Sequence, residues 1–142
     1  LLNTLSLMLD EYYEVLDEKM DPEMNSFDKL LYLNYEVHKW LEESVNLELL
    51  TSLYSTQLVA SGQSCLLDQN RVYYQLLNRI IEEGQNRGQI RGDVSVTEIA
   101  RYYAMCERAL VSDWCLSRGA YHLGDHNKKY MAYMMEHYKG EK

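Results

Sequence analysis

The stretch Glu82–Glu98, EEGQNRGQIRGDVSVTE, decides the fold because it sets the end of one helix against the start of the next. Gly88 stands where the first helix should stop, since glycine adopts the left-handed C-terminal conformation without a steric penalty at Cβ. Ser95 and Glu98 have capping-box spacing, in which the Ser95 hydroxyl accepts from the Glu98 amide and the Glu98 side chain accepts from the Ser95 amide. One helix should therefore end near Arg87 and another should begin after Ser95.

Helix-breaking and helix-capping residues divide the rest of the chain in the same way. Pro22 cannot continue a helix, and Asn25 or Ser26 can cap the next one. The segments SGQSC and SRGAYHLGD break the pattern again at 61–65 and 117–125. Gly84 falls on an apolar helical arc, which predicts close approach of a neighbouring helix. Apolar residues recur at helical spacing between the breaks, and alternating Val/Ile/Thr runs are missing, so we predict an all-α domain without a sheet. The six expected helices cover about 1–20, 27–45, 47–60, 69–87, 96–116 and 126–138.

Composition limits the class of protein. The chain has 142 residues, 46% of them hydrophobic and 25% charged, which suits one domain, 1–142, with a single core. No apolar run is long enough for a membrane span. The net charge of −8 argues against contact with a phosphate backbone through these residues. The three cysteines are Cys65, Cys106 and Cys115. They form no metal-type pair, and their odd number fits a reduced cytoplasmic protein.

The order of motifs around the opening stretch resembles a known family. The run from Glu82 to Leu116, EEGQNRGQIRGDVSVTEIARYYAMCERALVSDWCL, is similar to the seventh helix end, loop and eighth helix of tetracycline-repressor (TetR) family transcriptional regulators. Ala109 stands where many members carry glycine. The residues that match the family pattern are Glu83, Gly84, Gly88, Ile90, Arg91, Asp93 and Trp114.

The resemblance implies a function and an assembly. It implies the effector-binding domain of a ligand-responsive regulator, a homodimer joined by the last two helices as a four-helix bundle, and no enzyme activity or cofactor. The family's DNA-reading helix-turn-helix unit is not in this sequence. The chain begins inside a helical pattern without Met, so we expect 1–20 to connect such a unit to the domain. Effector binding would then change operator affinity through this helix.

The last two helices predict dimerisation independently of the resemblance. Around the helix 96–116, Arg101, Arg108 and Ser112 form one narrow polar sector, while most of the circumference is apolar. The helix 126–138 also points apolar side chains in several directions. Helices of this kind need burial on two sides, and a partner chain is the simplest source of the second. The predicted interface residues are Cys106, Leu110, Trp114, Tyr130, Met131, Tyr133, Met134 and Tyr138.

Polar residues inside apolar arcs predict a ligand pocket. Asn34 and His38 lie one turn apart, and Gln57 and Glu107 occupy similar arcs of two other helices. Burying such groups costs free energy unless they find partners, so they satisfy one another, cap a backbone or line a pocket. The chain has 13 Tyr against one Phe, and a tyrosine offers an apolar ring with a polar tip. The aromatic candidates on apolar arcs are Tyr12, Tyr54, Tyr73 and Tyr103.

Enzyme and metal sites lack their sequence patterns. A di-iron helix pair needs a glutamate three residues before a histidine, and no histidine of the chain has one. No phosphate loop, nucleophile elbow or dinucleotide fingerprint is present. His122 and His126 have helical metal-pair spacing, but Gly124 between them predicts a loop. The sequence therefore predicts no metal and no cofactor. The competing hypothesis is a helical interaction module that binds another protein and no small molecule.

Overall fold

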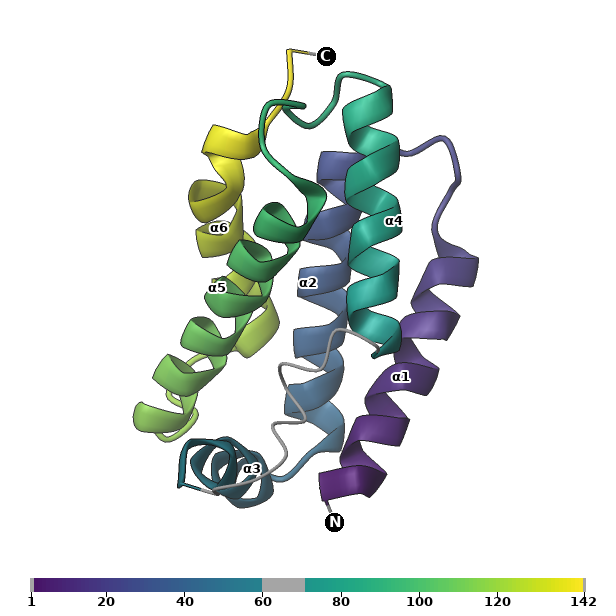
Figure 1. Ribbon diagram of the computed structural model, residues 1–142. Coiled ribbons are helices and arrows are strands. Elements are labelled where there is room, and N and C mark those ends of the chain that lie inside the picture. Colours follow the sequence, from purple (N-terminus) through teal and green to yellow (C-terminus); the bar gives the residue numbers. More distant parts are fainter. Residues whose placement is uncertain (1, 60–70, 142) are drawn as a thin grey trace.

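The structure is a computed structural model that describes residues 2–59 and 71–141, with the side chains of 5–56 and 71–141. This part of the chain is all-α, which confirms the predicted fold class with its six helices and no sheet (Figure 1). Among the described helices, none has the length and apolar character that crossing a membrane requires. The helices are α1 (Leu2–Lys19), α2 (Ser26–Ser44), α3 (Leu47–Val59), α4 (Val72–Asn86), α5 (Val96–Leu116) and α6 (Leu123–Met135), followed by the short 3-10 turn η2 (Glu136–Tyr138).

Local signals fix three helix ends as predicted. Asn25 caps α2 through a bond of 2.8 Å from the Phe27 amide to its side-chain oxygen. The Ser95 hydroxyl accepts from the Glu98 amide at 3.1 Å and so caps α5. The predicted return bond from the Glu98 side chain is absent from the described residues, so only half of the capping box forms. Gly88 has a φ of 74°, which confirms its left-handed conformation after α4.

The prediction for the start of α6 is wrong. We expected a loop around Gly124 and a helix from His126, but α6 begins at Leu123 and includes the glycine. The Leu123 amide donates to Glu42 of α2 at 2.7 Å, so α2 supplies the missing cap. A Cβ on Gly124 would lie 3.2 Å from the Tyr35 carbonyl oxygen. This glycine therefore lets α6 approach α2 closely. The stabilisation from that packing outweighs the low helix propensity of glycine.

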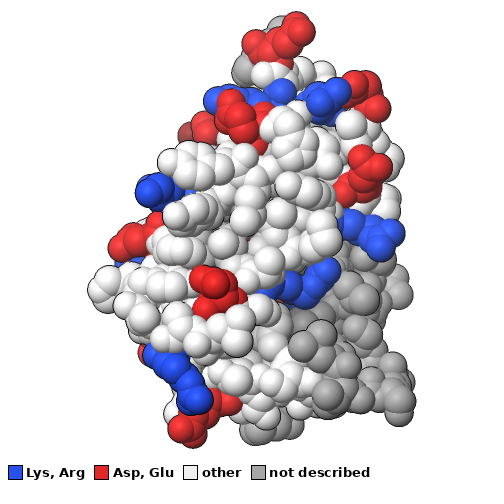
Figure 2. All heavy atoms as spheres, turned by 90° about the vertical axis from the view of Figure 1, so that its left-hand side faces the viewer, with Lys and Arg blue, Asp and Glu red and all other residues white. Residues whose placement is uncertain are grey.

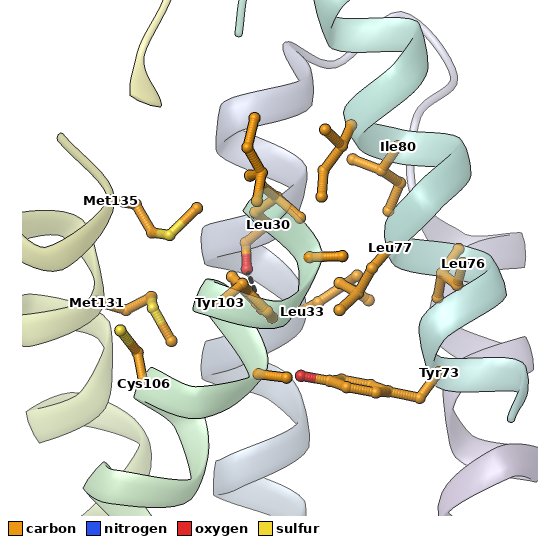
Figure 3. Close-up of a cluster of buried hydrophobic side chains, with 14 of the residues drawn as sticks. Leu30, Leu33, Tyr73, Leu76, Leu77, Ile80, Tyr103, Cys106, Met131 and Met135 are labelled. Atoms are coloured by element: carbon orange, nitrogen blue, oxygen red, sulfur yellow. Dashed lines mark hydrogen bonds between the residues drawn. The ribbon is translucent and has the colours of Figure 1, made fainter. Parts of the chain in front are cut away.

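Helix α2 runs through the middle of the domain, with α1 and α4 on one side and α5 and α6 on the other (Figure 1). Helix α3 lies across the end where the chain begins. The main core fills the space between α2, α4, α5 and α6 around Leu30, Ile80 and Tyr103 (Figure 3). A second cluster beside α3 includes Leu50 and Trp114. The two hydrophobic clusters therefore meet toward the end of the bundle where α3 lies (Figure 1).

The loop between α4 and α5 is hydrogen-bonded to the C-terminal segment 138–140. The Arg91 amide donates to the Tyr138 carbonyl at 3.0 Å, and the Gly140 amide donates to the Gln89 carbonyl at 2.8 Å. The Arg91 guanidinium makes two bonds of 2.7 Å to the Asp93 carboxylate and one of 3.1 Å to the His137 carbonyl. The loop between α4 and α5 is therefore held at the far end of the bundle from α3 (Figure 1).

Candidate functional site

A buried carboxylate joins three helices at the junction of the two cores. Glu107 of α5 is only 6% exposed. One of its oxygens accepts a hydrogen bond from the Tyr73 hydroxyl of α4, and the other accepts from the Asn34 amide of α2 at 3.0 Å. Figure 3 shows Tyr73 reaching across from α4 toward α5. Bonds to an ionised acceptor are stronger than neutral ones, so they offset much of the cost of burying this charge.

His38 extends this network along α2. Its Nδ1 lies 2.6 Å from the Asn34 carbonyl oxygen and 3.8 Å from a Glu107 oxygen. A carbonyl only accepts, so Nδ1 carries the proton and donates to it. The 3.3 Å approach of the Asn34 amide nitrogen to Nδ1 then joins two donors and is not a hydrogen bond. The other ring nitrogen of His38 remains for a further partner.

A small cavity lies beside the network and is lined by five helices. Its volume is about 50 Å³, which leaves room for only a few water molecules. Helix α1, the first helix of the described chain, contributes to its wall. The lining residues are Leu9 and Tyr13 of α1, His38 and Leu41 of α2, Tyr54 of α3, Arg71, Tyr73 and Tyr74 at the start of α4, and Ala104, Glu107 and Arg108 of α5.

Burial and the Glu107 charge keep the tyrosines around this site protonated. Burial raises the pKa of Tyr13, Tyr54, Tyr73 and Tyr103, and the nearby Glu107 carboxylate raises each of them further. At neutral pH these side chains are therefore phenols that can donate hydrogen bonds. The wall of the cavity combines such donors with aromatic rings and aliphatic side chains.

The structure brings together most of the predicted ligand-binding residues. His38, Tyr54, Tyr73 and Glu107 line the cavity, and Asn34 lies behind them, bonded to Glu107. The two remaining tyrosines lie elsewhere. The Tyr103 hydroxyl donates to the Leu30 carbonyl at 2.7 Å (Figure 3), and Tyr12 stacks on Trp40 with ring centres 4.9 Å apart. The side chain of Gln57 lies outside the described residues.

Sequence reasoning missed Tyr13 and Arg71. Tyr13 shares its buried face of α1 with Leu16 and Met20, at helical spacings of three and seven residues. Tyr12 has equally helical spacings to Leu9 and Leu16, so the pattern alone does not separate the two tyrosines. Arg71 is the N-cap residue of α4, and an arginine in that position gives no sequence signal for a place in a cavity wall.

The predicted interface residues divide between the core and the surface. Those buried within the subunit itself are Cys106, Leu110, Trp114, Met131 and Tyr138. Tyr133 is 64% and Tyr130 38% exposed, and Met134 is half-buried. Met105 and Leu116 of α5 are also exposed. Figure 2 shows the side of the molecule formed by α5 and α6, where a broad uncharged area has charged side chains mostly around its rim.

The histidine pair at 122 and 126 does not build a metal site. His122 lies 3.3 Å from Glu42, whereas the His126 ring packs on Tyr121 with centres 4.0 Å apart. No three His, Cys, Asp or Glu side chains gather as metal ligands among the residues with described side chains.

The described part of the chain is thus an all-helical bundle with a small cavity whose wall includes the first helix. The chain belongs to the TetR-type family described as "YsiA-like protein, C-terminal region", whose sequence profile matches residues 6–137. This match confirms the resemblance seen around the α4–α5 loop. Searches of curated proteins and of solved structures gave no significant match.

Proposed function

We propose that this domain binds a small-molecule effector in the cavity beside Glu107 and thereby controls DNA binding by a helix-turn-helix unit linked to α1. The observation that carries the proposal is the lining of the cavity. It combines a buried carboxylate held by α2 and α4 with Leu9 and Tyr13 of α1. A ligand that displaces Leu9 or Tyr13 changes the position of α1, and differential binding of this kind is what shifts a two-state regulator.

The cavity is narrow, so effector binding has to widen it. An effector therefore favours a more open arrangement of the bundle over the one described here, which links occupancy to helix position. The Asp17–Arg79 ion pair, at 2.7 Å, joins the C-terminal half of α1 to α4. We expect α1 to pivot about this end while its N-terminal half moves.

A thermal-shift screen of small organic compounds tests effector binding. A compound at ~100 times its dissociation constant should stabilise the domain by about 2.7 kcal/mol. Tyr73→Phe, which removes the hydroxyl bonded to Glu107, should weaken a hit. Tyr121→Phe is the matched control, since its hydroxyl bonds to the exposed Asp113 carboxylate, away from the cavity. Equal loss of binding in both variants, or no loss in either, would remove the cavity as the effector site.

We also propose that two copies associate through the outer faces of α5 and α6. Tyr133 of α6 and Met105 and Leu116 of α5 are exposed. The side of the molecule formed by these two helices has a broad area with few charges (Figure 2), and exposed hydrophobic surface of this kind favours association. Sedimentation should show a dimer that Tyr133→Lys dissociates. Leu7→Lys is the control, because Leu7 of α1 is equally exposed, at 64%. A monomer at high concentration would favour the second candidate, a module that binds a different protein through this face.

A further inference from the structure

Arg71 presents an unused donor in the cavity wall. Its Nε is buried and has no hydrogen-bond partner within the described part of the chain, and its guanidinium lies over the Tyr73 ring at 5.4 Å from the centre. No ion pair holds it among the described residues. Arg71 also occupies the N-cap of α4, which has no side-chain cap. The partial positive charge of the helix N-terminus therefore adds to the charge of the arginine.

Tyr13 presents a second donor in the same wall. It is 6% exposed, and its side chain lines the cavity. Burial and the Glu107 charge raise its pKa, whereas the Arg71 charge opposes that rise. Arg108 lines the cavity as well and bonds only weakly to the Tyr74 hydroxyl, at 3.3 Å.

Glu107 is the one acidic residue among the lining residues, and its two oxygens are already engaged by Tyr73 and Asn34. Among the lining residues, the buried side-chain atom without a partner in the described part of the chain is Arg71 Nε, a donor, and the two arginines of the wall outnumber the carboxylate. A doubly charged phosphate would meet repulsion from Glu107, and the cavity of about 50 Å³ is small. A planar, singly charged carboxylate matches the size, the charge and the donor geometry of an arginine.

We propose that the cavity binds the carboxylate of a small organic acid, with Arg71 and Tyr13 as its hydrogen-bond donors. This assignment rests on the proposed function and adds the chemical class of the effector. The apolar body of the acid packs against Leu9, Leu41 and Ala104, which line the same cavity. Leu9 and Leu41 move aside to accept it, and Leu9 carries this movement into α1.

Three isosteric probes test the assignment by calorimetry on this chain: benzoate, benzamide and benzamidinium. We expect benzoate to bind at least about tenfold more tightly than the neutral or the cationic probe. Arg71→Gln and Tyr13→Phe should each weaken benzoate and leave benzamide unchanged. Arg101→Gln is the matched control, because Arg101 is exposed on α5 outside this cavity. Melting temperatures of all variants establish that they are folded, and Tyr13→Phe suffices if Arg71→Gln unfolds.

Two results would overturn the assignment. If benzamide or benzamidinium binds as tightly as benzoate, or if both cavity variants retain benzoate, the carboxylate is not recognised by Arg71 and Tyr13. If none of the probes binds at concentrations of about 10 mM, the carboxylate class is excluded as well. A thermal-shift hit of another class that Tyr73→Phe weakens would still support the proposed function, so the two hypotheses fail separately.

Discussion

Replacing Gly84 with alanine should destabilise the domain although alanine is the better helix former. The new Cβ would lie 2.7 Å from Cδ1 of Ile90 and 2.7 Å from Cβ of Ser26. Both neighbours are almost fully buried, at 1% and 0% exposure, so they have little room to move. Overpacking of this kind costs about 1–3 kcal/mol, and the gain in helix propensity returns about 1 kcal/mol. The net expected loss in the free energy of unfolding is therefore up to about 2 kcal/mol.

Gly92 provides the matched control within the same stretch. A Cβ there would meet nothing within 4 Å, and Gly92 is not among the glycines with positive φ. Gly92→Ala should therefore be neutral or stabilising by up to about 1 kcal/mol, since alanine restricts the unfolded chain. Urea unfolding followed by circular dichroism gives both values. If Gly84→Ala is as stable as Gly92→Ala, with unchanged m, the contact between α2 and α4 does not depend on the glycine.

Three further changes have defined outcomes. Ser95→Ala should lower stability by about 1 kcal/mol in urea unfolding, because it removes the α5 cap; no change would mean that the cap is dispensable. Glu107→Ala should cost roughly 2–4 kcal/mol by the same assay, because it leaves the buried Tyr73 and Asn34 groups without their acceptor; a cost under about 1 kcal/mol would contradict their pairing. The hydrogen bond from Arg91 lowers the pKa of Asp93 below 3.8, so the stability that this pair contributes is present above 3.8 and is lost as the pH falls through the folded-state pKa. An NMR titration of the Asp93 carboxyl should show this shift, and Arg91→Gln should abolish it.

Local sequence determined the helices and three of their ends. Asn25, Gly88 and Ser95 act on backbone groups within three residues of themselves, so their effect is the same in almost any tertiary setting. The family pattern around the α4–α5 loop is readable for the same reason. Its Arg91–Asp93 pair spans two residues, although the bonds of Arg91 to the C-terminal segment are not evident from sequence.

Tertiary structure alone decided which side chains form the site and at which residue α6 begins. Glu42 caps α6 from a helix 81 positions earlier, and that distant donor–acceptor pair leaves no periodic trace. Helix wheels selected Asn34, His38 and Glu107, yet they could not show that Tyr13 rather than Tyr12 faces the cavity. Neighbouring residues on a helix point about 100° apart, so the choice between them depends on which helices pack alongside. Periodicity reports that a face is buried, whereas the partner that buries it is set by packing between distant segments.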